Sequence, residues 1–333
     1  MGCLVMRMLL GPFSLLFRFL AALRSMAYAR GWKRSTRLPV PVLVVGNITA
    51  GGAGKTPLTL ALVAWLKDAG YKPGIVSRGY GGSARLAMPV RADSDPRLVG
   101  DEPVLLARRG GCPVWIGARR GEAGSRLLDF HPEVDVVVAD DGLQHYALDR
   151  DMEVAVVDGQ RGFGNGWLLP AGPLREPEKR LDRVTAVVCN GGSCGRLALA
   201  APVFGMRLAG QRLYNLVEPT RLAAAAEMAD TPVHAIAGIG HPQRFFEHLA
   251  GLGLAVIPHA FPDHHDFKAE DLPAGRFVMT EKDAVKIAPL ARQMGLEDCW
   301  VLEVDAELGQ GLKELLLNRL SQCRVRNHGP QTA

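Results

Sequence analysis

Residues 41–57, PVLVVGNITAGGAGKTP, constrain the fold of this chain more than any other segment does. Val42 to Val45 is a short aliphatic run, which is typical of a buried strand. A glycine-rich loop that ends in Lys-Thr follows, and Leu58 to Lys67 has the pattern of a helix. A strand, a glycine-rich loop with Lys-Thr and a helix form the phosphate-binding P-loop arrangement, so the first ligand we expect is a nucleoside triphosphate.

The loop offers several kinds of group to a phosphate. Its backbone N–H groups curl around phosphate oxygens, and the N-terminus of the next helix adds positive field. Lys55 would reach the outer phosphates, and Thr56 would offer its hydroxyl to Mg²⁺. The residues expected along the nucleotide are Thr49, Ala50, Gly51, Gly52, Ala53, Gly54, Lys55 and Thr56. Thr49 stands where the usual pattern has glycine, so a glycine-rich turn without a nucleotide is the alternative.

The rest of the chain alternates strands with helices, which predicts an α/β fold with a parallel sheet wrapped by helices. We expect a P-loop kinase-like core and, from near His234, a second and smaller α/β lobe, with a cleft between the two. The expected divisions are an N-terminal amphipathic helix at 1–37, a P-loop core domain at 38–215 and a smaller C-terminal lobe at 216–325.

The positive charge of the chain is concentrated at its N-terminus. The net charge is +5, but residues 1–40 hold seven basic and no acidic side chains, which leaves 32 basic and 34 acidic side chains elsewhere. This balance gives no support to nucleic-acid binding. Leucine and phenylalanine recur at helical spacing between Leu9 and Leu23, and such a helix with only cationic charges suits an anionic membrane surface. A signal peptide cleaved near Ala27-Tyr28-Ala29 and a helix packed on the protein's own core are the alternatives.

Two adjacent acids follow the apolar run at 136–139. Asp140 and Asp141 stand where a Walker B acid would hold Mg²⁺ beside the P-loop; two ordinary turn aspartates are the alternative. Gln144 and His145 continue the same loop, at the carboxyl edge where open α/β sheets bind their ligands.

Other residues could take part in proton or phosphoryl transfer. Asp101 and Glu102 precede a helix, so they either cap it or accept a proton from a hydroxyl group. The run Asp263-His264-His265-Asp266 suits a general base better than a metal site, and solvated loop residues are the simpler interpretation. Arg175 could neutralise charge on a transferred phosphoryl group or form a surface salt bridge with Glu176.

Together these segments resemble the tetraacyldisaccharide 4′-kinases of lipid A biosynthesis. The motifs that carry the resemblance are GNITAGGAGKTP at 46–57, SRGYGG at 77–82, GDEP at 100–103, ADDGLQH at 139–145, LREP at 174–177, DHH at 263–265 and TEKDAVK at 280–286. They stand in the family's order, and the family tolerates Thr49 in place of glycine. The resemblance implies transfer of the γ-phosphoryl group of ATP to the 4′-hydroxyl of a tetraacylated glucosamine disaccharide 1-phosphate, which gives lipid IVA.

The resemblance also implies roles for single residues. Asp101 matches the family's catalytic base, with His264 as its dyad partner and Asp263 beside it, while Lys55 and Arg175 complete the catalytic set. The implied Mg²⁺ residues are Thr56, Glu102, Asp140, Asp141 and Glu176. Gln144 would lie near the nucleotide, and the residues implied near the acceptor are Asn47, Arg78, Tyr80 and His145.

We therefore expect a monomeric enzyme that uses ATP and Mg²⁺, binds no nucleic acid and sits, peripheral or monotopic, on the cytoplasmic face of the inner membrane. A lipid acceptor would account for the cationic, apolar N-terminal helix. The main rival is a deviant-Walker ATPase, but that class has a lysine directly before the paired glycines, where this chain has Ala50. A membrane-bound nucleotide-sensing scaffold would leave Asp101 and the Asp263-His264 pair without a role.

Overall fold

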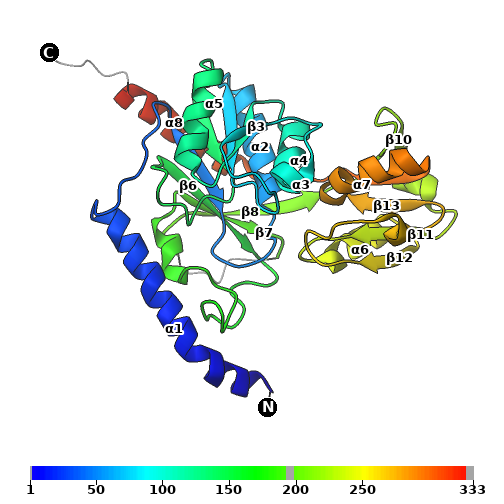
Figure 1. Cartoon of the computed structure of the whole chain (residues 1–333), viewed down its shortest axis with the longest axis horizontal. Helices are drawn as coiled ribbons and strands as arrows, with labels where there is room; N and C mark the ends of the chain where they lie inside the picture. The colour runs from blue at the N-terminus through cyan, green and yellow to red at the C-terminus, as the bar shows by residue number, and fades with distance from the viewer. Residues whose placement is uncertain (1, 193–198, 328–333) are drawn as a thin grey trace.

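Strands and helices alternate along the chain and build two sheets. The structure is a computed structural model that describes residues 2–192 and 199–327. A large lobe holds one sheet, a smaller lobe beside it holds the other, and a long N-terminal helix projects from the large lobe (Figure 1). The expected α/β class with a second, smaller α/β lobe is confirmed.

The sheet of the large lobe is mainly parallel, and its strand order within the described residues is β15-β8-β7-β6-β1-β5-β2-β4-β3. The P-loop strand β1 lies at its centre and pairs in parallel with β5 and β6. β3 and β15 pair antiparallel at the two edges. The strands are β1 (Val42–Gly46), β2 (Pro73–Ser77), β3 (Met88–Val90), β4 (Val114–Ile116), β5 (Val136–Ala139), β6 (Met152–Asp158), β7 (Ala186–Asn190), β8 (Val203–Ala209) and β15 (Asp305–Leu308).

Helices cover both faces of this sheet. In β1, Leu43 and Val45 join the apolar cluster beneath α2, α4 and α8, while Val42 and Val44 join the cluster beneath α5. A strand that is buried on both faces is apolar at every position, which is why the run at 42–45 predicts this strand. The helices of this lobe are α2 (Lys55–Asp68), α3 (Pro96–Val99), α4 (Asp101–Gly110), α5 (Arg120–Phe130), α8 (Gln310–Asn327) and the 3₁₀ turn η1 (Glu178–Arg183).

The small lobe has its own sheet, with the strand order β10-β9-β14-β13-β11-β12 in the described part of the chain. Its strands are β9 (Arg212–Asn215), β10 (Leu222–Ala224), β11 (Val233–Ala237), β12 (Val256–Ala260), β13 (Phe277–Thr280) and β14 (Cys299–Leu302). Its helices are α6 (Pro242–Gly251), α7 (Glu281–Met294) and the 3₁₀ turns η2 (Ala225–Met228) and η3 (Ala269–Asp271). α7 is the element that runs along α4 of the large lobe.

The expected division of the chain at 216–325 differs from the sheet membership. The second sheet begins earlier, at Arg212, and its last strand in sequence ends at Leu302. The chain then returns to the large lobe, because β15 pairs with β8 and α8 packs its leucines into the apolar cluster shared with α2. The small lobe is therefore an insertion between β8 and β15, and the last 23 described residues, 305–327, belong to the P-loop lobe.

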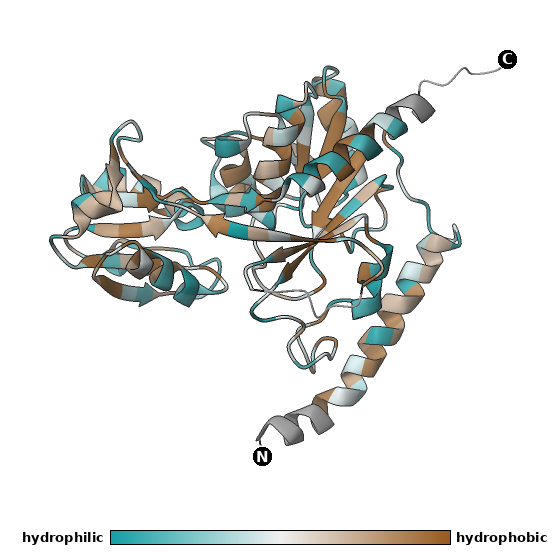
Figure 2. Ribbon diagram, turned by 180° about the vertical axis from the view of Figure 1, so that it is seen from behind, coloured by the Kyte–Doolittle hydropathy of each residue, from teal (hydrophilic) through white to brown (hydrophobic). Residues whose placement is uncertain are grey.

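The N-terminal helix α1 (Gly2–Ala29) meets the large lobe along part of its length only. Ser14 donates a hydrogen bond to the carbonyl of Leu168 at 2.7 Å, and the backbone of Gly11 lies against the Trp167 ring. From Leu9 onward, most of its large apolar side chains stay exposed, Phe13 at 62% and Phe19 at 63% among them. Figure 2 shows this apolar helix extending away from the body. Residues 9–29 are long and apolar enough, by length and composition, to cross a membrane.

Candidate active site

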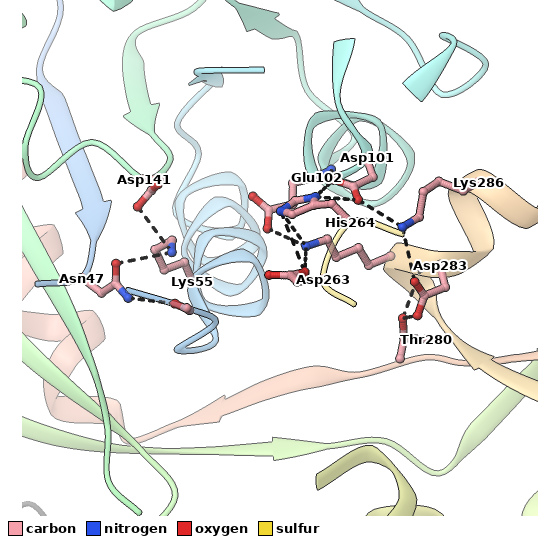
Figure 3. A network of polar contacts seen from close by, with 12 residues as sticks. Asn47, Lys55, Asp101, Glu102, Asp141, Asp263, His264, Thr280, Asp283 and Lys286 are labelled. Carbon is pink, nitrogen blue, oxygen red and sulfur yellow. Dashed lines mark hydrogen bonds and ion pairs between the residues drawn. The ribbon is translucent and has the colours of Figure 1, made fainter. Parts of the chain in front are cut away.

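The P-loop is held in shape by Asn47, which directly follows β1 and is fully buried. Its amide nitrogen donates to the carbonyl of Gly51 at 3.2 Å, and its amide oxygen accepts from Lys55 Nζ at 3.4 Å (Figure 3). Gly54 has a φ of +91°, and a Cβ there would meet Asn190 Nδ2 at 2.6 Å, so this position needs glycine. Asn47 thus supports the loop, and its implied place near the acceptor stays a prediction.

Asp140 and Asp141 follow β5, the strand next to β1, and so lie beside the P-loop. Asp140 is buried, and its Oδ1 accepts a hydrogen bond from Thr59 at 3.0 Å while its Oδ2 has no partner. Burial, followed by the negative charges of Glu102 and Asp141, raises the pKa of Asp140 to about 7. An unpaired buried carboxylate oxygen beside other acids is suited to a divalent cation.

Asp141 has the opposite electrostatic balance. Its Oδ1 is 3.4 Å from Lys55 Nζ, and its Oδ2 is 3.5 Å from Arg175 Nη1. Burial alone would raise the pKa of Asp141, but these two cations lower it below its ordinary value. The structure therefore brings together the P-loop lysine, one Walker B acid and Arg175.

Arg120 is a site residue that the sequence analysis missed. It is buried at the start of α5, and its guanidinium donates to the carbonyls of Asp140 at 3.1 Å and Asp141 at 2.6 Å. Its backbone N–H donates to His145 Nε2 at 3.3 Å. Burial and the nearby arginines, Arg120 first among them, lower the pKa of His145 to about 4, so this ring is neutral at pH 7. Because Arg120 contacts backbone atoms of the acidic loop, no side-chain motif signals it in the sequence.

Glu176 belongs to a separate hydrogen-bonded group. Its Oε2 accepts from Gln144 at 2.7 Å, and its Oε1 accepts from the Tyr146 hydroxyl. Gln144 also donates to the carbonyl of Asn47 at 3.0 Å. Both carboxylate oxygens of Glu176 are therefore engaged behind the P-loop.

Asp101 and His264 come together from the two lobes, although they are 163 residues apart in the sequence. Asp101 is the first residue of α4, and His264 Nδ1 is 3.0 Å from its Oδ2 and 3.2 Å from its Oδ1. Burial opposes ionisation of Asp101, but the hydrogen bond from His264 and the charges of Lys282 and Lys286 lower its pKa. That hydrogen bond also raises the pKa of His264.

An aromatic ring and further charged side chains surround this pair. The Tyr80 ring centre lies 5.0 Å from that of His264, and Tyr80 is 61% exposed. Lys282 Nζ contacts Asp263 Oδ1 at 2.9 Å and Glu102 Oε1 at 3.3 Å. Figure 3 shows Asp101, Glu102, Asp263 and His264 clustered at one end of α4.

The charged side chains of the site form two clusters. The P-loop cluster consists of Lys55, Asp140, Asp141 and Arg175, and the dyad cluster consists of Asp101, Asp263, His264 and Lys282. Glu102 acts on both, because it contacts Lys282 and its negative charge raises the pKa of Asp140. Within the described residues, no three His, Cys, Asp or Glu side chains are close enough to hold a metal ion by themselves.

Comparisons with known proteins show which family this chain resembles. The family model described as tetraacyldisaccharide-1-P 4′-kinase matches residues 6–321. A tetraacyldisaccharide 4′-kinase from Azoarcus sp. is 52% identical over 322 residues, which cover 95% of this chain and 93% of the relative. The corresponding protein from Chromobacterium violaceum is 51% identical over 317 residues, covering 94% and 93%. A solved structure from Aquifex aeolicus, described as an apo form in complex with ATP, is 29% identical with a TM-score of 0.78, covering 94% of this chain and 99% of the other.

Proposed function

The chain belongs to the tetraacyldisaccharide-1-P 4′-kinase family, and we propose that its two side-chain clusters divide the work of phosphoryl transfer between donor and acceptor. It is a kinase of lipid A biosynthesis that phosphorylates the 4′ position of a tetraacyldisaccharide 1-phosphate. The P-loop cluster would hold ATP, and the Asp101–His264 pair would receive the proton of the acceptor hydroxyl. The observation that carries the proposal is the 3.0 Å contact of this pair across the two lobes.

The donor side rests on Lys55, Thr56 and Arg175. The backbone N–H groups of the loop and the N-terminus of α2 would bind the phosphates, with Lys55 at the outer ones. Arg175 reaches the same carboxylate as Lys55, that of Asp141. An arginine so placed would neutralise charge that develops on the γ-phosphoryl oxygens.

The residues beside the P-loop fit Mg²⁺. The unpaired Oδ2 of Asp140, together with Asp141 and Thr56, provides the hard oxygen donors that this ion prefers, and Glu102 contributes negative charge nearby. When bound, Mg²⁺ would neutralise charge on the β- and γ-phosphates. Glu176, also expected at the metal, would first have to release Gln144 and Tyr146.

The acceptor side rests on an aspartate that stays ionised at neutral pH, because its pKa is lowered despite its burial. The hydroxyl proton would pass to Asp101 while the hydroxyl oxygen forms a bond to the γ-phosphorus. The bond from that phosphorus to the bridging oxygen breaks, and ADP leaves. Tyr80, Arg78 and His145 would contact the sugar, and hinge closure of the lobes would exclude water that would otherwise hydrolyse ATP.

The test is an assay of the purified protein with ATP and the disaccharide 1-phosphate, followed by detection of the 4′-phosphorylated product. Formation of a 1,4′-bisphosphate supports the proposal. Hydrolysis of ATP without a phosphorylated lipid would contradict it and favour an ATPase of another class.

Helix α1 would anchor the enzyme at the inner membrane, on the cytoplasmic side where ATP is available, with the protein acting as a monomer. Its exposed Phe13 and Phe19 and the seven basic residues of positions 1–40 support insertion into an anionic lipid surface. We expect deletion of residues 1–25 to weaken binding to vesicles that contain anionic lipid. Unchanged sedimentation with such vesicles would mean that α1 serves only to pack on the protein.

A further inference from the structure

Two lysines of the small lobe reach the Asp101–His264 pair. Lys282 and Lys286 on α7 are four residues apart, so they lie on the same face of the helix, one turn apart. Their ammonium groups meet opposite ends of the pair: Lys286 Nζ is 3.6 Å from Asp101 Oδ2, and Lys282 Nζ is 3.3 Å from His264 Nε2. We call Lys282 and Lys286 the α7 lysine pair.

Lys286 presents its charge from a fixed position. Only 11% of its side chain is exposed, and its other ion-pair partner is Asp283 Oδ1 at 3.5 Å. Asp283 is fully buried, and its Oδ2 accepts hydrogen bonds from Thr280 Oγ1 at 2.6 Å and from the Gly238 N–H at 3.0 Å. Figure 3 shows Lys286 between Asp101 and Asp283. A nearly buried cation held between two carboxylates has little freedom to leave them.

Lys282 determines which nitrogen of the neutral His264 ring carries the proton. An ammonium group has donors only, so the ring nitrogen that faces it, Nε2, must be the acceptor. The ring proton then sits on Nδ1, which lies 3.0 Å from Asp101 Oδ2. Lys282 therefore favours the tautomer in which His264 donates its hydrogen bond to Asp101.

We propose that the α7 lysine pair positions the proton acceptor of the reaction: Lys286 fixes the Asp101 carboxylate, and Lys282 fixes the orientation and tautomer of His264. The inference rests on the proposed function, because it assigns the pair to the aspartate that takes the proton. Neither lysine need touch a substrate, so both are positioning residues. Since α7 belongs to the small lobe and Asp101 to the large lobe, the base is complete only when the lobes adopt this arrangement.

The alternative is that the pair merely ties the lobes together. The same two helices are already joined by Arg109 on α4, whose Nη1 is 2.7 Å from Glu281 Oε1 on α7. Arg109→Met would loosen this interface without removing a contact of the dyad, which makes it the matched structural control. Lys268→Met controls for loss of a small-lobe charge, because Lys268 is 72% exposed.

The first measurement is steady-state kinetics with both substrates. We expect Lys282→Met and Lys286→Met to lower kcat about 10- to 100-fold, as a misplaced catalytic group does, while the KM for ATP stays within about twofold. Lys286→Arg, which keeps the charge, should recover part of the loss. Lys268→Met should leave kcat unchanged. Wild-type kcat in both methionine variants, or an equal loss in Arg109→Met, would overturn the inference.

The second measurement separates this inference from the proposed function. If the lysines act through Asp101, adding Lys286→Met to Asp101→Ala should cause no further loss of kcat, whereas independent contributions would multiply. A multiplied loss contradicts the inference. Normal turnover of Asp101→Ala alone would instead reject the proposed base, and impaired Asp101→Ala with fully active lysine variants would reject only the role of the lysines.

The third measurement needs no active variant. The ring nitrogen shifts of His264, assigned by comparison with His264→Gln, should show Nε2 unprotonated in the neutral wild-type ring. Lys282→Met should shift the ring toward a mixture of tautomers. A wild-type ring with its proton on Nε2 would overturn the assignment, even if a methionine variant failed to fold.

Discussion

Two buried aspartates of the same site, Asp101 and Asp140, differ in how their charge is balanced. Both are almost inaccessible to solvent, with 5% and 1% exposed. Burial, Glu102 and Asp141 raise the pKa of Asp140 to about 7. The pKa of Asp101 is lowered instead, because His264 and the α7 lysine pair outweigh its burial.

The difference shows which part of the site the protein completes by itself. The dyad cluster contains its own counter-charges, because the small lobe supplies His264, Lys282 and Lys286 opposite the Asp101 carboxylate of the large lobe. The acidic cluster beside the P-loop comes from the large lobe alone and leaves an oxygen of Asp140 without a partner. Such an unpaired oxygen suits a cation, which we propose this cluster binds together with the phosphates, whereas the dyad depends on the arrangement of the lobes.

Loss of the P-loop lysine should have the largest effect, because Lys55 contacts Asp141 and is proposed to bind the outer phosphates. Lys55→Ala is expected to lower phosphoryl transfer by about 10³-fold or more, since it removes the cation at the outer phosphates, and to leave the fold intact. Activity is followed by the lipid product and folding by circular dichroism. Lys67→Ala, at the other end of α2, is the control. Full activity in Lys55→Ala would remove the P-loop from the mechanism.

Asp101→Ala should come next. A positioned base contributes about 10²–10⁴-fold to turnover, so kcat should fall by that much while ATP affinity, measured by calorimetry, hardly changes. A lower kcat with unchanged ATP affinity would show that the dyad cluster and the P-loop cluster have separate roles. Normal turnover would return Asp101 to a structural role at the start of α4, where its Oδ1 already accepts from the Glu102 N–H at 2.8 Å.

Asp140→Asn should increase the stability of the fold at high pH, because it removes a buried charge that lacks a counter-charge. A carboxyl with its pKa raised to about 7 binds a proton more tightly in the folded than in the unfolded state, so its contribution to stability falls as pH rises from about 4 to 7. In EDTA at pH 8, this cost is at most about 4 kcal/mol. The asparagine variant, which still accepts from Thr59, should then unfold at a higher temperature than the wild type.

The same measurement has a matched control of opposite sign. The pKa of Asp141 is lowered, so its charge stabilises the fold at pH 8 and Asp141→Asn should unfold at a lower temperature. The Asp140→Asn difference should shrink as the pH falls toward about 4, where Asp140 is protonated in the wild type, whereas the Asp141→Asn difference should shrink only below about pH 4. If Asp140→Asn were no more stable than the wild type at pH 8, the negative charge of Asp140 would be balanced by cations of the protein, which contradicts the prediction.

The sequence predicted the P-loop side of the site better than the Asp101–His264 side. The P-loop and the Walker B acids come from the ends of adjacent strands, and each is a local motif. The contact of Asp101 with His264 joins residues 163 positions apart, and only the resemblance to a known family paired them. Arg120 acts through backbone carbonyls, so its residue type gave no signal. The spacing of Lys282 and Lys286 indicates one face of a helix, but nothing local says what that face meets.

In the fold, too, local patterns could be predicted from the sequence and long-range pairings could not. The α/β class and the central strand could be predicted from the sequence, because a strand buried on both faces is a continuous apolar run. The return of β15 and α8 to the large lobe was not, since a four-residue strand pairs according to tertiary packing. Its partner β8 lies about 100 residues earlier in the sequence.

The smallest effect is expected where the lobes meet on the P-loop side. Arg244 on α6 is 2.5 Å from Asp158 at the end of β6, and Arg161, whose N–H also donates to Asp158, lies against Gly51. Arg244 is 30% exposed, and such ion pairs contribute up to about 1 kcal/mol. Arg244→Gln should therefore raise the KM for ATP by no more than about fivefold and leave kcat unchanged. A loss of kcat like that expected for Lys286→Met would show that closure on the P-loop side also assembles the base.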